Sequence, residues 1–251
     1  MLKGEPLIEF LSQSGRLRVA AIEAYLDESG THQGANVLCV GGYVGERDEW
    51  LSFVGEWQVR LNDARISCFH ARKRECDPLR PYLMNAIDKR DFRGIVVSVN
   101  PIDFKSNTTE QFKGQIGNAY ATCTFLCAQE ICKWAQENKW KPVSFVIEDG
   151  QPNTEYIERT LLAFMREAPD SFIAGVTRGK KAQYIPLQPA DFLSHVYCDN
   201  DPFWFEQLAK SDKVFNAHLK PKEIIIASQW LKRTNTQQKN LKRRIKHGTF
   251  I

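Results

Sequence analysis

The chain has 251 residues, of which 43% are hydrophobic and 25% are charged, an ordinary composition for a globular protein. A chain of this length can bury a stable core without disulfide or metal staples, and its seven cysteines include no Cys-x-x-Cys pair, which argues against a disulfide framework or a zinc ribbon. No apolar run approaches the roughly 18 residues that span a bilayer, and the N-terminus does not resemble a signal peptide, so we expect no membrane segment and a cytoplasmic location.

The net charge of +4 is concentrated at the C-terminal end. No acidic residue follows Glu223, whereas residues 232–251 contain seven basic ones, and the rest of the chain has 27 basic against 30 acidic residues. This tail is either a solvated terminal segment or a contact for the phosphate backbone of nucleic acid. In the second case Arg243 and Arg244 are candidates for substrate binding.

The first predicted elements are two strands. Residues 18–27 and 37–45 are apolar runs joined by a polar, glycine-containing connection, which predicts an antiparallel hairpin. Gly41 and Gly42 lie inside the second run and indicate a bulge or a close approach of another backbone.

The hydrophobic period then changes to that of a helix over residues 46–64, with one stripe formed by Trp50, Val54, Trp57 and Leu61. A short apolar run at 66–70 follows and ends in a histidine, as a strand end would. A proline-containing stretch at 77–83 opens a helix that reaches about Lys89.

From residue 93 onwards, predicted strands and helices alternate. The strands are 93–100, 141–150 and 171–177, and the helices are 118–139, 153–169 and 187–200. The order predicts an α/β fold with a mixed sheet, an antiparallel N-terminal hairpin and helices on both faces. We expect an N-terminal extension at 1–17, a single domain at 18–231 with a candidate insertion at 199–222, and the basic tail at 232–251.

Acidic residues recur at the ends of these elements. Asp27 and Glu28 end the first predicted strand, Glu148 and Asp149 end a later one, and Asp191 falls in the first turn of the helix at 187–200. Ligands of open α/β sheets collect at strand ends, and clustered carboxylates need a counter-charge. Mg²⁺ prefers oxygen ligands and suits such a cluster, and a pair of such ions can promote phosphodiester hydrolysis.

Each acidic position also has a structural alternative. Asp27 and Glu28 precede Ser29 and Gly30, and Glu148 and Asp149 precede a glycine, so both pairs are also good turn sequences. With Pro189 as the first helical residue, Asp191 lies two residues further on, where a carboxylate complements the helix dipole.

Other polar residues have two interpretations as well. His70 is either a structural residue or a metal ligand or proton shuttle beside a substrate. Gln188 either caps its helix or positions water or substrate. Lys180 and Lys181 lie in a basic loop that is either solvated or in contact with a substrate phosphate.

The segments YLDESG, FHA, VIED and LQPAD, in this order, resemble a large bacterial family catalogued as domain of unknown function 3800, over roughly residues 22–200. That family looks like a member of the ribonuclease H-like superfold, which implies a metal-dependent phosphodiesterase. The resemblance implies that Asp27, Glu148 or Asp149, and Asp191 are the metal ligands. Glu28 and His70 match the signature of the family itself. The superfold's usual second ligand, a glutamate on a helix, has no clear counterpart here, and Glu28 is its candidate replacement.

We therefore expect a nuclease that uses Mg²⁺ or Mn²⁺ to hydrolyse RNA or DNA, with Asp27, Glu28, His70, Glu148, Asp149 and Asp191 as its catalytic candidates. The alternative is a non-catalytic module of a mobile-element or defence system that binds nucleic acid or a partner. A protein partner or a homo-oligomer fits either hypothesis.

Overall fold

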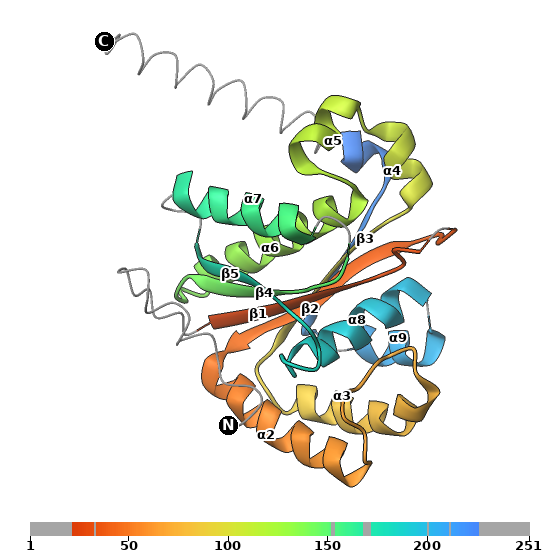
Figure 1. Ribbon diagram of the computed structural model, residues 1–251, viewed down its shortest axis with the longest axis vertical. Coiled ribbons are helices and arrows are strands. Elements are labelled where there is room, and N and C mark those ends of the chain that lie inside the picture. The colour runs from red at the N-terminus through yellow and green to blue at the C-terminus, as the bar shows by residue number, and fades with distance from the viewer. Residues whose placement is uncertain are drawn as a thin grey trace.

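The computed structural model describes residues 22–225, apart from 33, 152–153, 168–171, 200 and 211 (Figure 1). The predicted extension at 1–17 and the basic tail at 232–251, with Arg243 and Arg244, lie outside the described residues.

The described strands form one six-stranded sheet in the order β5-β4-β1-β2-β3-β6. Strands β1, β2 and β3 are antiparallel neighbours, whereas β4 runs parallel to β1, β5 parallel to β4, and β6 parallel to β3. The bounds of the strands are β1 Ile22–Ser29, β2 Leu38–Glu46, β3 Arg93–Val99, β4 Val143–Glu148, β5 Ile173–Gly179 and β6 Val214–Leu219.

Helices cover both faces of the sheet (Figure 1). One face packs against α4 Pro101–Asn107, α5 Glu110–Ile116, α6 Ala119–Glu137 and α7 Thr154–Glu167. The other face packs against α2 Arg47–Asp63, the 3₁₀ helix η2 Arg74–Leu79, α3 Arg80–Asp88, α8 Leu187–Asp199 and α9 Pro202–Ala209. The predicted fold class, an α/β fold with a mixed sheet, an N-terminal antiparallel hairpin and helices on both faces, is confirmed.

The alternation of side chains along β1 explains why the sheet has two cores. Successive residues of a strand point to opposite faces. Ala24 and Leu26 therefore belong to the core under α6 and α7, whereas Tyr25 belongs to the core under α2 and α8. In α2 the buried stripe includes Phe53, while the predicted Val54 is only partly buried.

Three local predictions differ from the structure. Strand β1 continues to Ser29 because its pairing with β2 continues, so Asp27 and Glu28 lie inside the strand, opposite Gly41 and Val40. The chain leaves the strand at Gly30, whose φ of +79° suits glycine.

Residues 66–70 form a loop and not a strand, because the N–H of Phe69 bonds to a helix side chain instead of a strand neighbour. Helix α8 begins at Leu187, so Asp191 lies beyond its first turn. The dipole explanation for Asp191 loses its basis, because that effect falls off within the first turn.

The segment at 199–222, considered above as an insertion, contributes α9 and β6. Strand β6 pairs with β3 from Gly94–Val214 to Val99–Leu219, so it extends the same sheet. Helix α9 buries Leu208 in the core that lies beneath α2 and α8. Among the described helices, none is long and apolar enough to cross a bilayer.

Candidate active site

Three of the predicted acidic residues meet at one lysine. The Nζ atom of Lys181 lies 2.6 Å from Oδ2 of Asp27, 3.4 Å from Oδ1 of Asp191 and 3.8 Å from Oε1 of Glu148. The side chain of Asp27 is fully buried, and those of Glu148, Asp191 and Lys181 are only 13–14% exposed. The structure therefore brings together residues that are far apart in the sequence.

Strand register places Asp27 beside Glu148. Leu26 pairs with Ile147 across the parallel strands β1 and β4, and each acid directly follows its member of this pair. Both acids lie two residues beyond Tyr25 and Val146, which belong to the core under α8. Because side chains alternate with a period of two, both carboxylates point to the α8 face of strands that lie about 4.8 Å apart.

A glycine lets α8 bring Asp191 to this level of the sheet. Gly41 pairs with Asp27, and a Cβ atom at Gly41 would lie only 3.1 Å from the backbone N and 3.2 Å from the Cα of Ser194. Ser194 lies on α8, one turn after Asp191. The close backbone approach that the sequence indicates at Gly41 is thus the contact between β2 and α8.

The loop after α2 also holds Asp191 in place. The backbone N–H of Ala71 donates to Oδ2 of Asp191 at 2.8 Å, which leaves Oδ1 directed to Lys181. Arg72 reaches from the same loop to the hydroxyl oxygen of Ser29 at the end of β1, at 3.0 Å. These two contacts could not be predicted from the sequence, because a backbone N–H donor and a serine hydroxyl form no recognisable sequence motif.

Gln188 is buried, and its amide is used entirely inside the protein. Its Oε1 accepts from the indole N–H of Trp57 at 2.8 Å and from the backbone N–H of Phe69 at 3.2 Å. Its Nε2 donates to the carbonyl of Lys181 at 3.2 Å and to Sγ of Cys68 at 3.7 Å. Gln188 therefore positions the loop and Lys181, and has no capacity left to contact a substrate directly.

Glu28 borders the cluster and is almost completely buried. As the neighbour of Asp27 in an extended strand, it belongs to the opposite face of β1. Its Oε2 atom is buried and accepts no hydrogen bond from any described group, and the same holds for Oε2 of Glu148. Two carboxylate oxygens without donors are costly in a protein interior.

The electrostatics of the cluster reflect this crowding. Burial raises the pKa of Asp27 to about 6, against the opposing effect of Lys181, and raises the pKa of Glu148 to about 8. Burial and the adjacent Asp27 hold the pKa of Glu28 well above its usual range. Burial alone would lower the pKa of the Lys181 ammonium, but the three carboxylates outweigh it and raise that pKa.

Other predicted site residues lie outside the group around Lys181. Asp149 forms an ion pair with Arg178 at 3.4 Å. Of the two adjacent acids Glu148 and Asp149, it is therefore Glu148 that joins the cluster around Lys181. Lys180 is exposed next to the half-buried Lys181.

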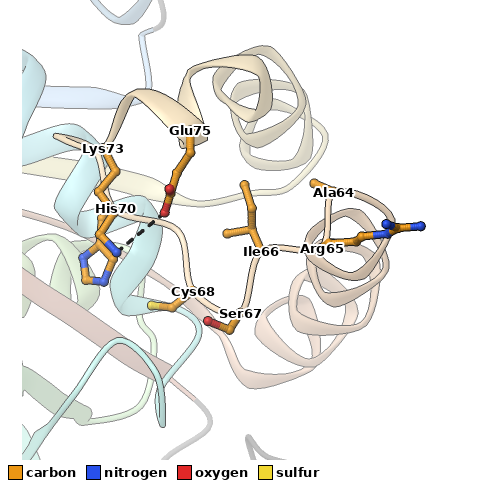
Figure 2. Close-up of a pocket in the computed structure, with 8 residues that line it drawn as sticks. All are labelled: Ala64, Arg65, Ile66, Ser67, Cys68, His70, Lys73 and Glu75. Atoms are coloured by element: carbon orange, nitrogen blue, oxygen red, sulfur yellow. Dashed lines mark ion pairs between the residues drawn. The ribbon is translucent and has the colours of Figure 1, made fainter.

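His70 lines a hollow of about 430 Å³, together with residues 64–68, Lys73 and Glu75. Figure 2 shows His70 and Cys68 on the side of the hollow nearest α8, whereas Arg65 extends away from it. Burial lowers the pKa of His70, although Asp191 acts in the opposite direction. His70 is thus half-buried and electrostatically linked to the cluster.

The donor set suits a hard divalent cation, although a lysine lies at its centre. Within the described part of the chain, no group of three or more His, Cys, Asp or Glu residues is placed to hold a metal as it stands. The ammonium of Lys181 lies where the three carboxylates converge. The surrounding ligands are carboxylate oxygens, which Mg²⁺ and Mn²⁺ prefer, and Oε2 of Glu148 is buried without a donor among the described groups.

Neither the protein-family models nor the curated proteins compared with this sequence give a match. Among solved structures, the chain is similar to ribonuclease HII of Archaeoglobus fulgidus in its complex with PCNA, with 14% identity, a TM-score of 0.42, and coverage of 85% of this chain and 90% of that chain. Ribonuclease H2 from Pyrococcus horikoshii OT3 is 13% identical with a TM-score of 0.44, and the match covers 92% of this chain and 90% of that chain. Bst-RNase HIII in complex with Mn²⁺ is 12% identical with a TM-score of 0.44, and the match covers 77% of this chain and 56% of that chain.

These neighbours are ribonuclease H-type enzymes. At such low identities and TM-scores the likeness carries no weight for activity. Function must be inferred from the side chains of this chain.

Proposed function

We propose that this protein is a divalent-metal-dependent nuclease that hydrolyses phosphodiester bonds of RNA or DNA. The observation that carries this proposal is the convergence of Asp27, Glu148 and Asp191 on one buried cation position. These three side chains would hold Mg²⁺ or Mn²⁺, and Glu28 would border the ion. When bound, such an ion would activate water and neutralise charge on a phosphodiester.

The other residues have supporting roles in this proposal. Gln188 and the N–H of Ala71 keep Lys181 and Asp191 in place. His70, half-buried at the edge of the cluster, would move a proton to or from the reacting groups. Lys180, with Arg243 and Arg244 of the tail, would contact substrate phosphates.

A cleavage assay tests the proposal. Purified protein is incubated with Mn²⁺ or Mg²⁺ and labelled single- and double-stranded RNA and DNA. We expect cleavage of at least one substrate, its loss on chelation, and a decrease of at least ~100-fold in Asp27→Asn and Asp191→Asn, in line with the loss of a metal ligand or its support. Glu110→Gln, which removes a highly exposed carboxylate of α5, should cleave like the wild type. Undiminished cleavage by Asp27→Asn would exclude this site.

A non-catalytic module is the second candidate, and one observation favours it. Lys181 already gives the three carboxylates a counter-charge without a metal. This candidate predicts salt-sensitive binding of nucleic acid, or binding of a protein partner or a second copy, without cleavage under any metal condition. Membership of the family of domain of unknown function 3800 and a cytoplasmic location remain predictions.

A further inference from the structure

We propose that Lys181 is an internal cation that competes with the divalent ion, so that the metal binds only when the ammonium leaves the cluster. This inference rests on the metal site of the proposed function. It adds that Lys181 sets the affinity of that site for the divalent ion, so that the ion binds or leaves according to the position of the Lys181 side chain.

The contacts of Lys181 require this competition. The ammonium contacts Oδ2 of Asp27 and Oδ1 of Asp191, and it approaches Oε1 of Glu148. A Mg²⁺ ion would need carboxylate oxygens of the same cluster at about 2.0–2.1 Å. An ammonium and a divalent ion cannot both take these oxygens, because their charges would repel at short range in a poorly solvated site.

Glu148 provides a second indication that a larger positive charge is accommodated here. Its Oε1 atom lies 3.8 Å from the ammonium of Lys181, and its Oε2 atom is buried and has no donor among the described residues. The single ammonium therefore leaves one oxygen of the cluster unsatisfied. A divalent ion brings twice the charge and more coordination positions than the ammonium.

The backbone can stay in place during the exchange. Gln188 holds the carbonyl of Lys181, and the N–H groups of Gln183 and Tyr184 both donate to the carbonyl of Lys180. Only the flexible four-carbon stem of Lys181 has to move. The side chain is partly exposed, so the released ammonium has a route to solvent, where it could pair with a substrate phosphate.

Calorimetric titration of Mn²⁺ into metal-free protein tests the exchange. Lys181→Met removes the competing charge but keeps much of the stem, and Lys180→Met is the matched control because Lys180 is the exposed neighbour. We expect Lys181→Met to bind Mn²⁺ about tenfold more tightly than the wild type, at the low end of typical coupling between two competing species. Lys180→Met should bind within about twofold of the wild type.

The outcomes separate this inference from the proposed function. If the wild type binds Mn²⁺ and Lys181→Met binds it equally or more weakly, the competition is wrong and the metal site stands. If neither protein binds Mn²⁺, the proposed metal site fails as well.

Metal-free Lys181→Met should also melt at a lower temperature than the wild type, and its melting temperature should rise more on addition of Mn²⁺. Should it be unfolded without metal, recovery of its circular dichroism signal in Mn²⁺ supports the exchange, and no recovery contradicts it.

Discussion

At the residue scale, the buried side chain of Gln188 supports several other groups of the interior. Its Oε1 satisfies two buried donors, the indole of Trp57 and the N–H of Phe69. Gln188→Leu would leave both without an acceptor, and each unsatisfied donor costs about 1–3 kcal/mol. We expect the free energy of unfolding to decrease by roughly 2–6 kcal/mol, measured by urea denaturation.

The control for Gln188 is Gln183→Leu, because Gln183 is exposed in the turn that contains Lys181. A surface substitution of this kind should change the stability by no more than about 0.5 kcal/mol. Equal stability losses in the two variants would mean that the hydrogen bonds of Gln188 are not what makes it important.

The acidic cluster predicts a pH dependence of the metal-free protein. The folded pKa of Glu148, about 8, lies above its ordinary value of 4.5, so the folded state retains a proton that the unfolded state has lost. Stability from this group is complete below the unfolded pKa and decreases as pH rises from about 4.5 to about 8. Burial is the largest cause of this raised pKa, and of the charged groups that face Glu148, Lys181 lowers the pKa whereas Asp27 and Asp191 raise it.

Urea midpoints measured in a chelator across this range check the sign. Relative to the wild type, Glu148→Gln should become progressively more stable as the pH increases from about 5 to about 8. A difference between the two proteins that stays constant with pH would show that Glu148 titrates at its ordinary value.

The sequence identifies the acidic positions but not all of their partners. Asp27, Glu148 and Asp191 can be located because they lie near the ends of predicted elements. Whether Glu148 or Asp149 joins the cluster cannot be decided from the sequence, because a shift of one residue reverses the face of the sheet. The central position of Lys181 depends on the turn after β5, which brings it back over β1 and β4, and no local pattern encodes that path.

At the element scale, the packing of α8 on β2 depends on a missing side chain. A Cβ atom at Gly41 would lie 3.1–3.4 Å from Ser194, so α8 or β2 must shift slightly to accept it. We expect Gly41→Ala to lower the free energy of unfolding by about 1–3 kcal/mol, the usual cost of overpacking. The shift would also move Asp191, so Mn²⁺ affinity should decrease.

Gly55→Ala is the matched control for this prediction. Gly55 lies exposed in α2, and a Cβ atom there would meet nothing within 4 Å. Alanine in an exposed helix interior is favoured over glycine by about 1 kcal/mol, so this variant should be more stable than the wild type. If Gly41→Ala behaved like Gly55→Ala, the contact with Ser194 would not be tight.

Among the elements, most segments with a strong apolar pattern were predictable, whereas the short apolar run at 66–70 was not. The hairpin of β1 and β2 and the helix α6 follow from strong patterns of apolar residues. The run at 66–70 has the composition of a strand, but its Phe69 packs between helices, and its N–H finds a partner in Gln188. A short apolar run cannot be assigned to a strand by composition alone.

At the scale of the whole molecule, the charge distribution predicts where nucleic acid binds. The seven basic residues of the tail at 232–251 account for the positive net charge of the chain. Deletion of this tail should weaken binding and reduce the slope of log affinity against log salt, by up to about 0.9 for each phosphate that the tail neutralises on duplex DNA. Fluorescence anisotropy over a range of salt concentrations measures both quantities. Unchanged affinity and slope would show that the tail does not touch the phosphate backbone.

The most direct test of the central claim is a crystal structure of the protein soaked with Mn²⁺, recorded with anomalous scattering. We predict an anomalous peak bounded by Asp27, Glu148 and Asp191, with the ammonium of Lys181 displaced from its present position. An absence of any peak there at saturating Mn²⁺, with Lys181 still paired to Asp27, would contradict a metal-dependent site in this protein.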